Sequence, residues 1–191
     1  AAYRIRAFNG ASNADVKNSR TAQEALFADF QTYGKSQSLV MLIAGAGGID
    51  SNTGAGALAS GPMPAATTTT NGCALSGPRN SDSAPVGVGT GLSNGVVYIS
   101  SSSTPVGGTQ RGSASFIMGA KHTQGNRVFA AETEGTAIFF VENPAWAGLA
   151  LDNASGPTTA YTLLNAAATT ATQLDGTVAA GGSPVANWTA Q

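Results

Sequence analysis

The fold is decided by the stretch AYRIRAFNGASNADVKNSRTAQEALFADFQTY, residues 2–33. It contains no proline and one glycine, Gly10, and it carries seven charged side chains. This composition predicts one helix over residues 1–33, which at about 1.5 Å per residue is roughly 50 Å long. A helix of that length exceeds what a compact domain of this size needs, so we expect part of it to project.

The second half of this helix carries an apolar stripe. Its members recur at helical spacing, and we expect them to form the core between the helix and a sheet: Val16, Leu26, Phe27, Phe30 and Tyr33. Burial of each aromatic side chain there contributes roughly 1.5 to 3 kcal/mol. The first half places Ile5 and Phe8 on a mixed face that suits a partner helix better than open water. Gly34 is the expected C-terminal cap.

Four runs of β-branched and aromatic residues, separated by turn residues, predict strands. They cover residues 96–101, 114–121, 127–131 and 136–141. Residues 123–126 and 134–135 are the expected hairpin turns. One face of such a sheet must be covered, and the amphipathic helix is the available cover. We therefore predict an α+β fold in which a long N-terminal helix packs on a four-stranded antiparallel β-sheet.

The remaining regions give weaker patterns. Residues 45–95 are rich in glycine and proline, so long regular elements are not expected there. The apolar run 39–44 is compatible with strand or helix. Residues 161–174 also stay open, because alanine and leucine favour helix whereas threonine favours strand. Trp188 is expected to pack the C-terminus onto the sheet. We treat residues 1–191 as one domain: helix 1–33, loop-rich αβ region 34–95, antiparallel sheet 96–142 and C-terminal region 143–191.

Composition limits the partners. Charged residues make up 10% of the chain and the net charge is -1. Nucleic acids and anionic lipids require clustered Lys and Arg, so we expect neither as a partner. Cys73 is the one cysteine, which excludes an intrachain disulfide and a cysteine-based zinc site. No stretch approaches the roughly 20 apolar residues that cross a bilayer.

Few residues could perform catalysis or bind a metal ion. The one histidine, His122, is interpreted as a solvated residue at a turn edge. Glu132 and Glu134 are interpreted as a solvated turn rather than an acid and base pair. Asp50 begins a segment like a calcium loop, but Gly54 stands where a ligand belongs. We therefore expect no enzyme activity, no cofactor and no metal site.

Two segments resemble type IV pilins, in particular the short-helix pilins of metal-reducing deltaproteobacteria. Residues 2–34, AYRIRAFNGASNADVKNSRTAQEALFADFQTYG, resemble the exposed half of the pilin helix. Residues 120–142, AKHTQGNRVFAAETEGTAIFFVE, are similar to a strand and turn stretch of pilin headgroups. Together the two segments cover about 30% of the chain. The resemblance implies the pilin fold.

The resemblance also implies a longer precursor with an apolar N-terminal helix of roughly 20 to 25 residues, enough to cross a membrane. In the family a peptidase trims the leader and the new N-terminal amine is methylated. The subunit is expected in the inner membrane before assembly and in an extracellular pilus at the cell surface after assembly. The expected partners are copies of the chain, the pilus assembly machinery and a second pilin subunit. Family members often pin the C-terminal region with a disulfide, which the single Cys73 excludes here.

The function that the resemblance implies is that of a structural subunit of a type IV pilus filament, built by repeated heterologous contacts that never close. Charge pairing along the helix is expected to set subunit register, through Arg4, Arg6, Asp15, Lys17 and Arg20. A type II secretion pseudopilin and a minor tip pilin or adhesin are the alternatives. The change in composition at residues 34–39 also permits two polypeptides, a short helical pilin and a headgroup partner, that meet or are joined there.

Overall fold

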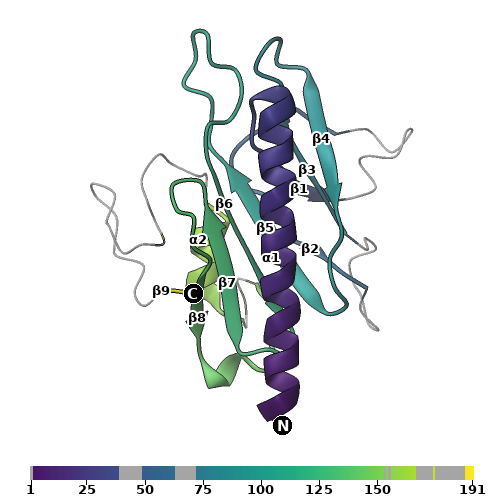
Figure 1. Ribbon diagram of the computed structural model, residues 1–191, viewed down its shortest axis with the longest axis vertical. Coiled ribbons are helices and arrows are strands. Elements are labelled where there is room, and N and C mark those ends of the chain that lie inside the picture. Colours follow the sequence, from purple (N-terminus) through teal and green to yellow (C-terminus); the bar gives the residue numbers. More distant parts are fainter. Residues whose placement is uncertain are drawn as a thin grey trace.

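A computed structural model describes residues 2–38, 49–62, 72–152, 154, 156–166, 174 and 188–191. Helix α1, Ala2–Phe30, runs along the long axis of the molecule, and its N-terminal end stands at one pole (Figure 1). The helix packs on antiparallel sheets, which confirms the α+β class and the place of the helix. Among the described helices, none combines the length and apolar character that a membrane span requires.

The larger sheet has six strands in the order β2-β5-β6-β7-β8-β9. These are β2, Ala59–Ser60; β5, Val96–Ser102; β6, Phe116–His122; β7, Arg127–Glu132; β8, Phe139–Glu142; and β9, Thr189–Ala190. The four predicted runs correspond to the consecutive strands β5 to β8. The prediction of a four-stranded sheet is wrong, because β2 and β9 extend it at both edges. Each edge strand has two residues, too few to leave a periodic pattern in the sequence.

A second sheet of three strands lies in the region predicted to be loop-rich. Its order is β1-β3-β4, with β1 at Lys35–Ser38, β3 at Cys73–Pro78 and β4 at Pro85–Thr90. The sequence analysis named no strand at these positions, and the strands are short, with four residues in β1 and six each in β3 and β4. Pro78 and Pro85 pair with each other at the end of the β3–β4 hairpin, where a missing N–H is tolerated. The apolar run 39–44 lies outside the described residues.

Small polar side chains occupy much of the buried face of α1. Apart from the adjacent Asp15 and Val16, the buried residues recur every three or four positions along the helix: Asn9, Ser12, Asp15, Val16, Ser19, Gln23 and Leu26. The Gln23 amide donates to Gly34 O at 2.7 Å and to Ser100 Oγ at 2.9 Å, and its Oε1 accepts from Gly34 N at 2.8 Å. These bonds satisfy the buried amide and tie the helix to the segment that follows it.

The predicted helix core is correct only in part. Val16, Leu26 and Tyr33 are buried in the cluster under α1, and Phe30 packs against that cluster from a half-buried position. Phe27 is 36% exposed, so its predicted burial against the sheet is wrong. The reason is that Gln23 and Leu26 take the inward positions, which turns Phe27 to the side, where its ring stacks on Tyr33 at 4.5 Å.

The predicted role of Gly34 as helix cap is also wrong. The helix ends at Phe30, and Gln31 takes the left-handed conformation, with φ of 53°, that a C-terminal cap requires. Gly34 instead allows a close approach of two backbones, because a Cβ there would lie 2.6 Å from Ser76 N.

Both faces of the larger sheet are covered. Alternate residues of β5 to β7, such as Tyr98, Phe116 and Phe129, join the core under α1. Their neighbours Ile99, Ile117 and Val128 join a second core, in which Leu164 of helix α2, Thr158–Leu164, is buried. The open choice for residues 161–174 is thus resolved as helix up to Leu164, and residues 167–173 lie outside the described part. Trp188 packs against the second core beside β9.

Candidate assembly surface

The outward face of α1 is lined by small side chains. Its exposed small residues recur at spacings of three, four and seven, which places them on one side of the helix: Ala7, Gly10, Ala14, Thr21, Ala25 and Ala28. We call this set the outward stripe. Lys17, which is also exposed, lies within it. A face with such short side chains lets a second helix approach to the short end of the usual interaxial range.

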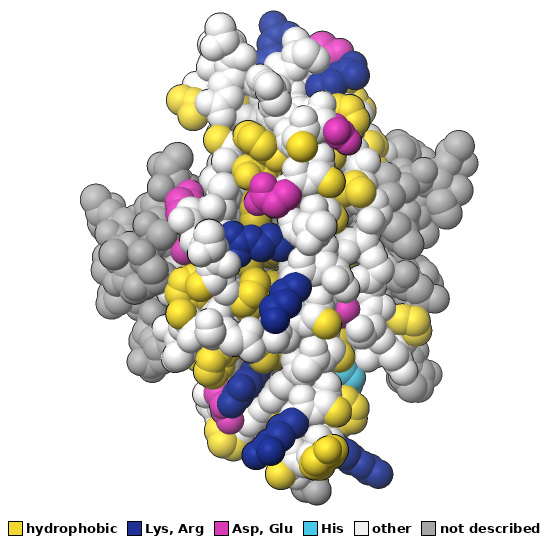
Figure 2. Space-filling view, in the orientation of Figure 1, with side chains coloured by type: hydrophobic (Ala, Val, Ile, Leu, Met, Phe, Trp, Pro, Cys, Tyr) yellow, Lys and Arg dark blue, Asp and Glu magenta, His cyan; other side chains and the backbone are white. Residues whose placement is uncertain are grey.

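Charges along α1 separate by sign. Arg4, Arg6 and Lys17 are exposed, as are Glu24 and Asp29 towards the other end. Figure 2 shows basic side chains over the N-terminal half of the helix and acidic side chains over its C-terminal half. Within the described part of the chain, the side chains of Arg4, Arg6 and Lys17 make no hydrogen bond or ion pair, whereas Glu24 borders Tyr33. Burial and, after it, the Glu24 charge raise the pKa of Tyr33 to about 12.

Asp15 cannot set register with a neighbouring subunit, so its predicted role is wrong. It is a buried residue on the inward side of α1, where Oδ2 accepts from Ser93 N at 2.7 Å and Oδ1 accepts from Ser93 Oγ at 2.9 Å. Burial raises the pKa of the Asp15 carboxyl, and the two Ser93 hydrogen bonds oppose that effect. The residue therefore fastens α1 to the loop before β5.

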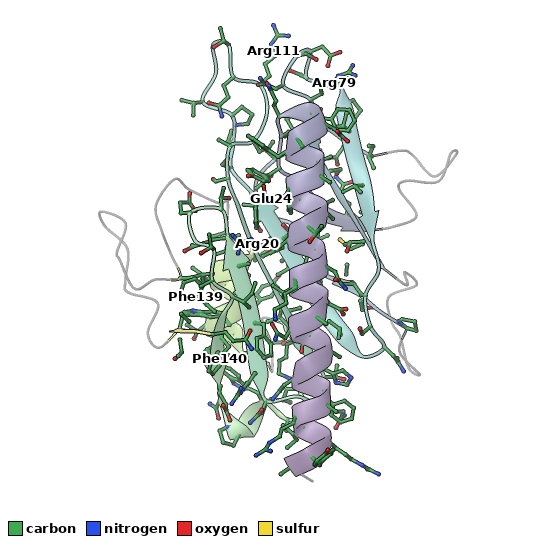
Figure 3. All side chains as sticks on the ribbon, in the orientation of Figure 1. Arg20, Glu24, Arg79, Arg111, Phe139 and Phe140 are labelled. Carbon is green, nitrogen blue, oxygen red and sulfur yellow. The ribbon has the colours of Figure 1, made fainter. Side chains whose placement is uncertain are left out.

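Arg20 is likewise committed within the chain. Its guanidinium donates to the carbonyls of Thr136 at 3.0 Å, Ala137 at 3.4 Å, Glu132 at 3.5 Å and, through Nη2, Gly135. Arg20 and Glu24 project from the same side of α1 (Figure 3). Arg20 thus donates to the carbonyls of the β7–β8 turn, and its role in intersubunit register stays a prediction. The predicted register residues that remain exposed are Arg4, Arg6 and Lys17.

A groove of about 520 Å³ lies between the N-terminal half of α1 and the β7–β8 side of the sheet. The lining residues come from the helix, from the two strands and from the C-terminal strand region: Ala2, Ile5, Arg6, Asn9, Gly10, Asn13, Asn126, Arg127, Phe129, Glu142 and Gln191. We call it the α1–β8 groove. It was not anticipated from the sequence, because its two walls are more than a hundred residues apart.

Hydrogen bonds hold the floor of the groove in place. Asn9 Nδ2 donates to Asn126 Oδ1 at 2.8 Å, and Asn9 Oδ1 accepts from the backbone of Asn126 at 3.1 Å and of Arg127 at 3.3 Å. Arg127 pairs with Glu142 at 2.7 Å and lies over the Phe140 ring, 4.6 Å from its centroid. The groove is therefore largely preformed rather than created by a partner.

The two arginines at the opposite pole of the molecule have partners within the chain. Arg79 and Arg111 lie together there (Figure 3), where Arg79 Nε donates to Asp82 Oδ1 at 2.8 Å and Arg111 Nη1 donates to Ser81 O at 3.0 Å. The free cations of α1 are thus a property of its N-terminal half.

The residues weighed for catalysis lie inside the fold. His122 is buried and stacks on Phe8 at 4.3 Å, so its interpretation as a solvated residue is wrong; burial lowers its pKa. Glu132, at the end of β7, is also buried, unlike the exposed Glu134. Leu174 N donates to Glu132 Oε2 at 3.3 Å. Burial raises the pKa of the Cys73 thiol to about 12. None of these groups lines the α1–β8 groove.

The described residues contain no cluster of three or more histidine, cysteine or acidic side chains suited to a metal ion. Asp50, the first residue of the calcium-like segment, uses Oδ1 to accept from Gln37 Nε2 at 2.6 Å and from Asn52 N at 2.9 Å. Its carboxylate thus supports the chain's own loop.

Sequence reasoning missed three groups on this surface: Glu24, Asp29 and the Asn13 amide. The two acids could have been found from the sequence, because they lie at one end of the predicted helix and the basic residues lie towards the other end. Asn13 gave no such signal, because its importance depends on the wall that β7 and β8 place beside it. Searches against protein-family models, curated proteins and solved structures find no match to this chain.

Proposed function

We propose that this chain is a structural subunit of a type IV pilus filament that assembles with copies of itself through α1. The observation that carries the proposal is the outward face of this 29-residue helix, which combines the outward stripe with unpaired basic charges at one end and acidic charges at the other. The resemblance of residues 2–34 and 120–142 to pilins supports the same proposal.

The charge separation favours an open polymer. When the basic half of one α1 meets the acidic half of another, each subunit uses two different surfaces and keeps one of each free. Such a heterologous contact repeats without closing unless its rotation forms a ring. The contact therefore yields a helical filament rather than a dimer.

The acidic residue in the last turn of α1 does not stabilise the isolated helix. Asp29 lies in the last turn, and no basic residue is present in that turn. An acid there opposes the helix dipole, at a cost of roughly 0.3 to 1 kcal/mol in an exposed position. A contact with a basic surface of another subunit would offset that cost, which supports an intermolecular role for the acidic half.

The proposal includes the location and partners of such filaments: an extracellular pilus, the inner membrane before assembly, and the machinery that builds the filament. A major pilin, a minor tip pilin and a secretion pseudopilin would share the same contact. Their abundance in the filament fraction sheared from cells separates them.

The test places a large side chain on the outward stripe. Ala14 is exposed on α1, so Ala14→Phe is expected to leave the melting temperature unchanged while filament yield in the sheared fraction falls at least about tenfold. Ala145, an exposed alanine away from α1, supplies the matched control Ala145→Phe, which should assemble as the wild type does. Normal filament yield for Ala14→Phe, or absence of the wild-type chain from the sheared fraction, would overturn the proposal.

A further inference from the structure

We propose that the α1–β8 groove receives residues 21–28 of α1 from a second copy of this chain, with Arg6 paired to the incoming Glu24. The inference rests on the proposed self-assembly and adds to it the site, the segment that fills it and their register.

Among the charged side chains that line the groove, one has no partner. Arg127 is neutralised by Glu142, and Glu142 also accepts from Asn126 Nδ2 at 3.0 Å. Arg6 lines the same groove, is exposed and makes no hydrogen bond or ion pair with the described residues. The occupant is therefore expected to bring a carboxylate to the Arg6 end.

The groove also holds an unsatisfied acceptor. Asn13 lines it, and the Asn13 Oδ1 atom is buried without a hydrogen-bond partner in the described part of the chain. Buried polar atoms nearly always have a partner, so a hydrogen-bond donor brought by the occupant would be favourable here.

The wall formed by α1 suits a helix. Its lining residues extend from Ala2 to Asn13, about three turns, which favours an elongated occupant over the tip of a turn. Gly10 stands in the middle of this wall, and a Cβ added there would meet nothing within 4 Å. Glycine in a helix interior is unfavourable relative to alanine, and no internal contact requires it here. Its missing side chain leaves room for a neighbour.

Residues 21–28 have the matching chemistry. Glu24 is an exposed carboxylate, and the exposed Ala25 and Ala28 leave the backbone accessible. Of the other exposed carboxylates described, Asp82 and Glu142 have ion-pair partners and Glu134 belongs to a turn. Asp29 is also exposed, but it lies five residues after Glu24 and so points to another side of α1.

The occupant must come from another copy. Arg6 and Glu24 are five turns apart on one rigid helix, about 27 Å at 1.5 Å per residue, so the Glu24 of the same chain cannot reach the groove. Two parallel helices shifted by this distance bring Arg6 to Glu24 and Gly10 to Ala28 at the same register. The small residues then face each other, which permits close packing between the charged contacts.

The first test is a charge swap in the full chain, read by sedimentation and by filament yield. Arg6→Glu and Glu24→Arg are each expected to weaken self-association at least about tenfold, and the double variant is expected to restore it. Arg4→Glu makes the same charge change in the same turn of the helix but outside the groove lining, so it should associate nearly as the wild type does.

The second test reads proximity and does not depend on charge. Cys73 is buried, so cysteines introduced at exposed sites react selectively. Chains carrying Gly10→Cys, mixed with chains carrying Ala28→Cys, should form disulfide heterodimers on mild oxidation, whereas Gly10→Cys mixed with Ala14→Cys should not.

The outcomes separate this inference from the proposed function. If the wild type assembles but Arg6→Glu assembles equally well and the Gly10 and Ala28 cysteines stay unlinked, the groove contact is wrong and filament assembly stands. If Glu134→Arg rather than Glu24→Arg abolishes association, the groove has a different occupant and the proposed segment is wrong. If the wild type does not self-associate at all, both are wrong.

Discussion

The Asp15 carboxylate grips Ser93 through both of its oxygens, with Oδ2 2.7 Å from Ser93 N and Oδ1 2.9 Å from Ser93 Oγ. Two residues on, Lys17 is exposed on the outward face. Charged side chains close together in α1 thus differ in role. Those on the inward side attach the helix to the rest of the chain, and those on the outward side are free to contact another subunit.

Asp15→Ala is expected to lower the free energy of unfolding by roughly 1 to 3 kcal/mol, because it leaves the Ser93 N–H without its acceptor. Asp15→Asn keeps an acceptor oxygen and should cost less, since burial already raises the pKa of this carboxyl and disfavours its charge. Urea denaturation measures both, with Asp29→Ala as the exposed control. Equal stability of Asp15→Ala and wild type would show that the Ser93 contact does not hold the helix.

Arg20→Lys is expected to destabilise the chain by about 1 to 2 kcal/mol, although the charge is retained. The single ammonium group of lysine cannot make all the hydrogen bonds that the planar guanidinium of Arg20 donates to the carbonyls of Thr136, Ala137, Glu132 and Gly135. Amide hydrogen exchange should accelerate in the β7–β8 turn. Lys17→Arg, the reverse exchange at an exposed position of the same helix, should change neither quantity; unchanged exchange in Arg20→Lys would contradict the assignment.

Because of His122, we expect the folded chain to lose stability in mild acid. Burial lowers the pKa of its imidazole below the usual 6.5, and Lys121 acts in the same direction, while hydrogen bonding to Asn94 and the charge of Asp15 oppose it. As pH falls through about 6.5 the unfolded chain takes up a proton that the folded chain resists, so this contribution is complete above that pH and is lost below it. Protonation also removes the Nδ1 lone pair that accepts from Gln124 N at 3.0 Å.

His122→Asn provides the comparison, because its side-chain oxygen can accept from Gln124 N without titrating. Urea denaturation between pH 5 and pH 8 should show a smaller pH dependence for the variant than for the wild type. The contribution of Asp15 is present in both chains and largely cancels in the difference. Identical slopes would exclude His122 as the source.

The sequence permitted the central strands and the helix to be predicted, because their patterns are local. Residues such as Val128 and Phe129 cluster between turn residues, and α1 lacks proline. The β3–β4 hairpin could not be recognised, since its alternation of glycine with Val86 and Val88 resembles a loop until Leu75 pairs with Val88. Gln23 could not be assigned to the core, because its burial depends on Gly34 and Ser100.

The residues of the candidate site also fall into some that the sequence predicts and some that it does not. Arg6 was chosen from its charge and remains available on the surface, whereas Asp15 and Arg20, chosen on the same ground, point towards Ser93 and the β7–β8 turn. These residues differ in whether they lie on the side of α1 that meets the sheet. That side is largely polar, so apolar periodicity does not identify it.

Gly10 links stability to assembly. Gly10→Ala is expected to raise the free energy of unfolding by about 0.5 to 1 kcal/mol, since alanine is the better helix former and its Cβ meets nothing within 4 Å. Gly10→Leu should also keep the helix, but its larger side chain would intrude on the α1–β8 groove and lower filament yield at least about tenfold. Thermal melting of the unassembled chain and the sheared filament fraction measure the two effects separately. Ala145→Leu, away from the helix, is the control for added apolar surface. A stable Gly10→Leu chain that assembles normally would mean that the glycine leaves no room for a neighbour, and the mid-helix glycine would then cost stability without a compensating contact.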